Sequence, residues 1–177
     1  MKLKKYFFNS VTSTNDIAIK KIRQKKISGI IIAKKQTRGR GRYGNKWISM
    51  KNNLFMSIFF KLNNNINLHK LTYNCCKIVR KSLMELINCK ITIKKPNDLM
   101  IKKKKICGIL QEKVNKLNHT YLIVGIGVNL IKSPFLRNYP TTHLRELVNK
   151  DISKKKFELE LKKIFENNLK RLIKKRV

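Results

Sequence analysis

The segment from Gln36 to Trp47 concentrates glycine and arginine in a way that suits the binding of an anion. It reads Gln-Thr-Arg-Gly-Arg-Gly-Arg-Tyr-Gly-Asn-Lys-Trp. Glycine lets backbone N–H groups approach an anion closely, and guanidinium groups bind phosphate or carboxylate through two hydrogen bonds. Spacing alone favours a mobile anion-binding loop and a plain basic surface loop about equally.

A second group of polar residues surrounds Pro96. The run Lys94-Lys-Pro-Asn-Asp98 places a carboxylate among cations, in a chain that has only 9 acidic residues. Such a carboxylate could orient a cationic nucleophile or hold Mg²⁺. Taken alone, the run is more typical of an ordinary Pro-Asn-Asp turn.

Two strand-like segments carry further candidates. Lys105 ends a run of four lysines and heads an otherwise apolar strand. Strand alternation therefore sets Lys105 apart from its solvated neighbours. A lysine at that position could bridge a carboxylate and a phosphate. The segment Gly125-Ile-Gly-Val-Asn129 combines small residues, which allow a ligand to contact the backbone closely, with an amide that can form hydrogen bonds to a nucleotide base.

The elements that must position these residues are a mixture of strands and helices. Strands are expected at 4–9, 29–34, 54–62, 91–95, 105–114 and 121–128, the last two joined as a hairpin. Helices are expected from a cap at Ser13 or Thr14 to Lys26, at 68–87, and along an apolar stripe at 157–172. Together they predict an α+β domain with a mixed, mostly antiparallel sheet flanked by helices.

The charge of the chain is strongly positive. The formal net charge is +34, from 43 basic and 9 acidic residues, and 42% of the residues are apolar, which excludes disorder by composition. The excess is mostly lysine, spread from Lys2 to Lys175 together with many Asn and Ile, and all three have AT-rich codons. We therefore attribute it to a low-GC genome and expect no specific nucleic-acid binding. A basic nucleic-acid-binding module remains the alternative from another functional class.

The cysteines and the N-terminus indicate the compartment. Cys75, Cys76, Cys89 and Cys107 fit neither a zinc site nor a disulfide framework, so reduced thiols are expected. No apolar run approaches the length of a membrane span, and the N-terminus lacks the pattern of a signal peptide. We expect a cytoplasmic protein without membrane contact, or one in an organellar stroma or matrix if a transit peptide was removed.

The order of the motifs resembles that of the biotin protein ligases, and the resemblance extends continuously from about residue 5 to residue 130. The Gly-Arg-Gly-Arg loop together with Pro-Asn-Asp is highly specific to that family. The resemblance implies a catalytic core of the biotin–lipoate ligase type, related to class II aminoacyl-tRNA synthetases. The motifs that carry it are Ser13-Thr-Asn15, Gln36 to Trp47, Lys94-x-Pro-Asn-Asp98, Lys105-x-x-Gly108 and Gly125-x-Gly-Val-Asn129.

The resemblance also implies a reaction in two steps. Biotin's carboxylate attacks the α-phosphate of ATP, with Mg²⁺, and forms biotinyl-5′-AMP and pyrophosphate. A lysine of a biotin carboxyl carrier protein, in acetyl-CoA carboxylase or another biotin enzyme, then receives the biotin and AMP leaves. A lipoate or octanoate ligase on the same fold is the nearest alternative, although its relatives lack the arginine loop.

The resemblance assigns roles to particular residues. The implied catalytic residues are Lys105, Asp98, Arg40 and Arg42, with the arginines folding over the intermediate. No metal ligand is assigned, and the surroundings of Asp98 are the one candidate position for Mg²⁺. The implied biotin contacts are Ser13, Thr14, Gln36, Gly39, Arg40, Trp47, Lys105, Gly108, Leu110 and Gly125. The implied ATP and adenylate contacts are Arg40, Arg42, Lys94, Asn97 and Asn129.

The sequence departs from the family pattern at three positions: Lys95 stands where the family has Trp, Met50 replaces a Pro, and Asn45 replaces an Arg. Too few residues precede the first motif for a winged-helix DNA-binding domain. The chain also ends at Val177, before the SH3-like domain of many members would begin. We therefore expect one catalytic domain over 1–177, and an exposed edge strand would allow two subunits to pair.

Overall fold

The structure is a computed structural model. It contains one mixed sheet of seven strands in the order β1-β2-β3-β7-β6-β5-β4. The edge strands are β1 (Lys5–Val11) and β4 (Thr92–Lys94). β1 pairs in parallel with β2 (Ser28–Gln36), and the other neighbouring pairs are antiparallel, which confirms the predicted fold class. The structure describes residues 2–62, 68–87, 89–137, 139–148 and 152–173.

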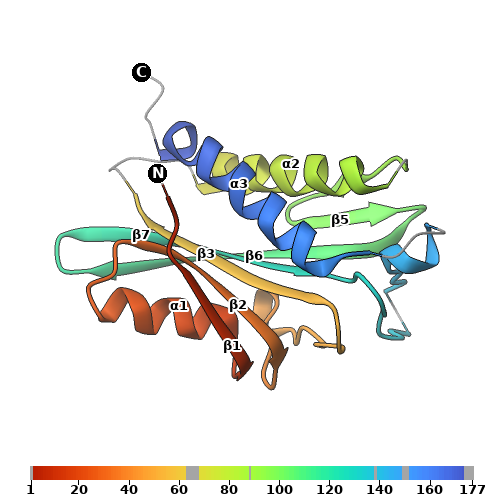
Figure 1. Ribbon diagram of the computed structural model, residues 1–177, viewed down its shortest axis with the longest axis horizontal. Coiled ribbons are helices and arrows are strands. Elements are labelled where there is room, and N and C mark those ends of the chain that lie inside the picture. Colours follow the sequence, from red (N-terminus) through yellow and green to blue (C-terminus); the bar gives the residue numbers. More distant parts are fainter. Residues whose placement is uncertain (1, 63–67, 88, 138, 149–151, 174–177) are drawn as a thin grey trace.

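Helices cover both faces of the sheet (Figure 1). α1 (Thr14–Arg23) lies against one face, and α2 (Leu68–Leu86) and α3 (Lys154–Ile173) lie against the other. The larger hydrophobic core lies between the sheet and α2 and α3. The predicted C-terminal stripe is confirmed up to residue 169, whereas the side chain of Leu172 lies outside the described residues. The buried members of this stripe are Phe157, Leu161, Phe165 and Leu169.

The centre of the sheet is formed by three long strands. β3 (Leu54–Lys61) is almost entirely buried, as expected of a strand covered on both faces. β6 (Lys104–Lys116) and β7 (His119–Val128) form the predicted hairpin, whose turn contains Leu117 at φ 51°. These strands bring Gly108 of β6 directly opposite Gly127 of β7.

One strand was missed by the sequence analysis. β5 (Asp98–Ile101) follows the Pro-Asn pair and continues as a hairpin into β6. The turn consists of Lys102 and Lys103, with φ of 46° and 63°, instead of the Asn-Gly or Asp-Gly pair that usually indicates such a turn. Because of this hairpin, Asp98 pairs with Gly108 and lies beside the beginning of β6.

Two short 3₁₀ helices were also unexpected. η1 (Arg42–Gly44) lies within the arginine loop, and η2 (Leu144–Glu146) follows β7. α1 begins after the predicted cap Ser13, whose hydroxyl accepts a hydrogen bond from the backbone N–H of Asn15. It ends at Arg23 instead of at the predicted Lys26.

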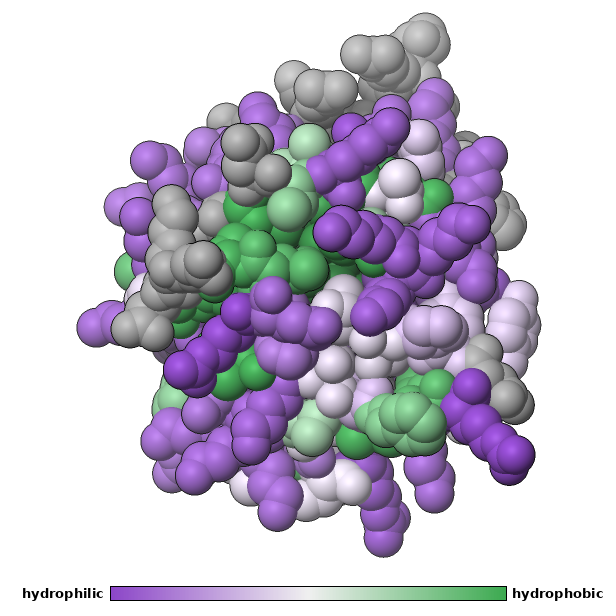
Figure 2. All heavy atoms as spheres, turned by 90° about the vertical axis from the view of Figure 1, so that its right-hand side faces the viewer, coloured by the Kyte–Doolittle hydropathy of each residue, from purple (hydrophilic) through white to green (hydrophobic). Residues whose placement is uncertain are grey.

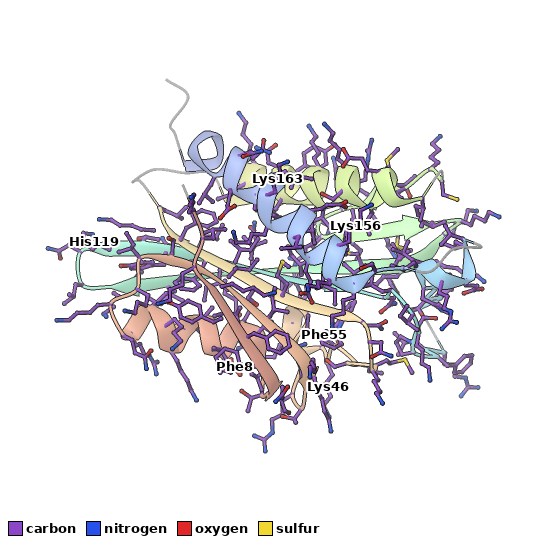
Figure 3. All side chains as sticks on the ribbon, in the orientation of Figure 1. Phe8, Lys46, Phe55, His119, Lys156 and Lys163 are labelled. Atoms are coloured by element: carbon purple, nitrogen blue, oxygen red, sulfur yellow. The ribbon has the colours of Figure 1, made fainter. Side chains whose placement is uncertain are left out.

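The surface is dominated by charged and polar side chains. Figure 2 shows hydrophilic residues over most of one face, around a smaller hydrophobic area. Lys156 and Lys163 lie on α3, whereas Lys46 lies on the other side of the sheet (Figure 3). The lysines are therefore distributed over both layers instead of following one stripe. Within the described ranges, no helix is long and apolar enough to cross a membrane.

Candidate active site

A cleft of about 480 Å³ opens at the N-terminal end of α1, between the arginine loop and the β6–β7 hairpin. Its lining brings together residues that the sequence analysis selected from five separate segments. Of the 15 residues predicted there, 12 line the cleft: Ser13, Thr14, Gln36, Arg40, Arg42, Trp47, Asn97, Asp98, Lys105, Gly108, Leu110 and Gly125.

One end of the cleft is polar because β1 and β2 run in parallel and end together. Their register pairs Val11 with Gln36, so the residues that follow β1 reach the end of β2. The backbone N–H of Thr14 donates to Gln36 Oε1 at 2.8 Å, and the Thr14 hydroxyl donates to the same oxygen at 3.1 Å. Ser57 of β3 supports this end by donating to Thr14 Oγ1 at 2.7 Å. Hydroxyl and amide groups are thus held at the N-terminus of a helix.

The arginine loop is attached to this polar end through two carboxylates. Arg40 Nη2 lies 2.8 Å from Glu112 Oε2 on β6 and 2.9 Å from Asp16 Oδ1 on α1. Asn15 Nδ2 donates to the same Glu112 oxygen at 2.6 Å. Sequence reasoning did not select Glu112 or Asn15 as site residues. The scarcity of acids was the available signal for Glu112, since a carboxylate four residues after Gly108 is unusual in this chain.

The opposite end of the cleft contains an ion pair between Lys105 and Asp98, two residues that the sequence analysis selected separately and did not predict to pair. Lys105 Nζ lies 2.9 Å from Asp98 Oδ1, and the contact is an ion pair without the angles of a hydrogen bond. Tyr139 donates its hydroxyl hydrogen to Asp98 Oδ2 at 2.7 Å. Burial, followed by this hydrogen bond, raises the pKa of the Tyr139 hydroxyl well above its usual value, so the group stays a donor. Tyr139 had no sequence signal, because it lies beyond all the motifs.

The floor of the cleft differs from the expectation that its glycines leave open space for the ligand. A Cβ atom on Gly127 would lie 2.5 Å from Trp47 Cε2, and one on Gly108 would lie 2.8 Å from Trp47 Cζ3. The indole ring of Trp47 therefore lies on these two glycines. At Gly125 the side chain of Asn15 occupies the corresponding space, at 2.4 Å from the added atom. The glycines admit side chains of the protein itself, which then shape the cleft.

Three of the predicted residues do not line the cleft. Asn129 is 1% exposed and its Nδ2 donates to the backbone oxygen of Thr142 at 3.1 Å. Lys94 extends over Tyr139, with its Nζ 4.3 Å from the ring centroid. A Cβ atom on Gly39 would lie 2.5 Å from the Trp47 carbonyl oxygen, so this glycine lets the loop fold back on itself. The ligand contacts implied for these residues stay predictions.

The residues near Asp98 do not fit the Mg²⁺ expected there. Both carboxylate oxygens of Asp98 already have partners, in Lys105 and Tyr139. Across the part of the chain that the structure describes, no group of three or more His, Cys, Asp and Glu side chains could hold a metal ion. Mg²⁺ is commonly bound through substrate phosphates with few protein ligands, so an ion that enters with ATP would not need Asp98 as a ligand.

The fold and the cleft together define a class: an α+β catalytic core in which a helix N-terminus, an arginine loop and a strand lysine face one another. Residues 7–129 match the Biotin/lipoate A/B protein ligase family, and the chain belongs to that family.

Individual relatives agree with this assignment. The bifunctional ligase/repressor BirA of Escherichia coli is 32% identical over 123 residues, which are 68% of this chain and 38% of BirA. The BirA of Bacillus subtilis is 36% identical over 110 residues, 59% of this chain and 33% of the relative. The chain thus spans well under half of the length of these relatives.

Solved structures match a larger part of the chain. The biotin protein ligase of Aquifex aeolicus in complex with biotin and ATP is 31% identical, with a TM-score of 0.79 over 96% of this chain and 72% of that one. A lipoate protein ligase of Thermoplasma acidophilum, at 11% identity and a TM-score of 0.62, covers 96% of this chain and 84% of that one. The latter likeness concerns the fold alone.

Proposed function

We propose that this chain is an ATP-dependent biotin protein ligase. It would activate biotin to biotinyl-5′-AMP and transfer the biotin to a lysine of a carrier domain. The observation that carries the proposal is the meeting, in one cleft, of the polar residues before α1, the arginine loop and Lys105. The likeness to an Aquifex aeolicus ligase described with biotin and ATP supports these two substrates.

The polar end of the cleft suits the ureido group of biotin. Ser13 and Thr14 supply hydroxyl groups, and Gln36 supplies an amide whose Nε2 hydrogens can donate and whose Oε1 can accept. Trp47 and Leu110 provide apolar surface for the fused rings and the valeryl chain. With the ureido group bound there, the carboxylate of biotin would lie towards Lys105, at the other end of the cleft.

The activation step joins two anions, so cations must reduce their repulsion. Lys105 would contact the biotin carboxylate and the α-phosphate, while Arg40 and Arg42 approach from the loop. A carboxylate oxygen attacks phosphorus, and the bond to the leaving pyrophosphate breaks. Closure of the loop would then shield the mixed anhydride from water.

The transfer step requires a neutral amine close to the anhydride. Asp98 would accept a hydrogen bond from the ε-amine of the acceptor lysine and take up its proton as the amide bond forms. AMP leaves as the acyl–phosphate bond breaks. The 13% exposure of the Asp98 side chain means that the carboxylate is largely shielded from solvent yet still lines the cleft.

The test is biotin-dependent exchange of pyrophosphate into ATP, measured with Mg²⁺ present and with lipoate in a parallel reaction. The proposal predicts exchange with biotin and none with lipoate. Exchange only with lipoate would assign the chain to the lipoate branch of the family. Absence of exchange with both acids would contradict an active ligase.

We further propose that the acceptor is the carrier domain of a biotin-dependent carboxylase. The pyrophosphate exchange reaction proceeds without an acceptor, so this proposal needs a separate test. Asn97 occupies the backbone groups of Ile109, and beyond that residue β6 has no strand partner on its outer side in the described residues, so this part of the edge could pair with an acceptor or a second copy of the chain. Streptavidin detection of a biotinylated carrier domain tests the acceptor, and light scattering of the ligase tests whether two copies of the chain associate.

The four free cysteines are compatible with a reducing compartment such as the cytoplasm.

A further inference from the structure

Tyr139 lies in the segment that follows β7 and is fixed beside the first residues of β6. The backbone N–H of Lys105 donates to the carbonyl oxygen of Pro140 at 2.8 Å, and the N–H of Thr142 donates to the carbonyl oxygen of Lys105 at 2.9 Å. These two hydrogen bonds attach the Tyr139 segment to the backbone of Lys105. The position of the tyrosine ring is therefore linked to the lysine proposed to activate biotin.

The side chain of Tyr139 contacts three charged groups at this end of the cleft. Its hydroxyl donates to Asp98 Oδ2 at 2.7 Å, while the other oxygen of Asp98 faces Lys105 Nζ at 2.9 Å. The ring centroid lies 5.3 Å from Lys105 Nζ and 4.3 Å from Lys94 Nζ. Both ammonium groups are within the range of a cation–π interaction. Of the described residues, Tyr139 alone contacts this carboxylate and both lysines.

We propose that Tyr139 is a positioning residue for the ligase reaction: its hydroxyl holds the Asp98 carboxylate so that the Lys105 ammonium group remains directed into the cleft. This inference rests on the proposed function and deepens it. Tyr139 acts through Asp98 and Lys105 and takes part in no bond-making step.

The physical reason is the number of hydrogen bonds that each group can make. When a largely buried carboxylate loses a hydrogen-bond donor, a conformation in which it finds another donor becomes favoured, because a buried acceptor without a partner costs free energy. Without the phenol hydroxyl, Asp98 can rotate and accept a hydrogen bond from Lys105, which now faces only one of its oxygens as an ion pair. The ammonium group is then drawn towards Asp98 and away from the reacting carboxylate and phosphate. The ring of Tyr139 contributes separately, because it retains Lys94 at the cleft edge.

Tyr139→Phe removes the hydroxyl and keeps the ring. We expect kcat for biotin-dependent exchange to fall about tenfold, with KM for biotin and ATP changed by less than about twofold, the size typical of one hydrogen bond to a charged group. Tyr139→Leu removes the ring as well and should also raise KM for ATP. Tyr73→Phe, on the exposed side of α2, is the matched control and should keep wild-type kinetics. Unchanged kcat in Tyr139→Phe, or a change confined to KM, overturns the proposal.

A second measurement needs no activity, so it separates this inference from the proposed function. Trp47 is the only tryptophan, and Lys105 Nζ lies 5.5 Å from the centroid of its ring. Its fluorescence should therefore report the position of the ammonium group. The emission spectrum of Tyr139→Phe should shift from that of the wild type towards that of Lys105→Met. An emission spectrum identical to wild type, in a variant whose Tm is retained, overturns the positioning role even if the wild type exchanges no pyrophosphate.

Discussion

Arg40 Nη2 lies 2.8 Å from Glu112 Oε2, and this contact attaches the arginine loop to the strand that forms the cleft floor. The side chains are 40% and 26% exposed, so water screens the ion pair and its contribution to stability is small. A weak contact suits a loop that is proposed to close over the intermediate, because Arg40 can leave Glu112 at little cost in free energy. Asp16, the second carboxylate on Arg40, is similarly exposed at 32%.

Glu112→Gln should therefore loosen the loop without unfolding the protein. Trypsin cleavage after Arg40 and Arg42 should accelerate about two- to fivefold, as expected for the loss of a partly exposed ion pair. Mass spectrometry of timed digests measures the rate at these bonds. Glu85→Gln, an exposed glutamate on α2, is the control and should leave cleavage unchanged. Equal loop cleavage in the two variants would show that Glu112 does not restrain Arg40.

Lys105→Ala should nearly abolish biotin-dependent pyrophosphate exchange. Loss of one preorganised group that stabilises developing charge costs about 100- to 1000-fold in rate. The neighbouring Lys104 is exposed, whereas the Lys105 side chain is 20% exposed and lines the cleft. Lys104→Ala should thus remain within about twofold of wild type, since it removes a charge from the same run without entering the cleft. A similar loss in both variants would indicate a general charge effect.

Gly127→Ala should destabilise the protein by forcing Trp47 from its position. The added Cβ would lie 2.5 Å from Trp47 Cε2, which is well inside van der Waals contact. Overpacking of this kind costs about 1–3 kcal/mol, measurable by urea denaturation. In a double-mutant cycle, Trp47→Leu should recover part of the loss, because the smaller side chain frees the space. Strict additivity of the two substitutions would contradict contact between them.

The buried thiols predict a loss of stability at alkaline pH. Burial raises the pKa of Cys75 from 9.0 to about 12, and that of Cys76 to about 11. The unfolded chain deprotonates near pH 9 while the folded chain does not, so the stabilisation is complete below pH 9 and is lost as pH rises from 9 towards 12.

The corresponding measurement is urea denaturation of wild type and Cys75→Ala at several pH values above 9. Lysines and tyrosines titrate in the same range, so only the difference between the two proteins is informative. The wild type should lose about 1.4 kcal/mol more per pH unit, the value for one proton. Parallel curves would show that Cys75 ionises equally in both states.

The local sequence pattern was sufficient to predict most of the strands and helices and many of the residues that line the cleft. The helix cap at Ser13, the β6–β7 hairpin and the stripe of α3 are each encoded by neighbouring residues, and each is found in the structure. Alternation also distinguished Lys105 from the three solvated lysines before it. β5 was missed because it has four residues and because two lysines, instead of glycine or asparagine, form its turn.

The sequence by itself determined which segments carry charge, glycine flexibility and helix caps, because these properties depend on residue type and on spacing within a few positions. Only the tertiary structure paired Glu112 with Arg40, 72 residues apart, and Tyr139 with Asp98, 41 residues apart. It also placed Trp47 on the two glycines that were expected to remain open. Such contacts follow from strand register and from the packing of separate elements, and no local pattern encodes the distance between residues that the fold brings together.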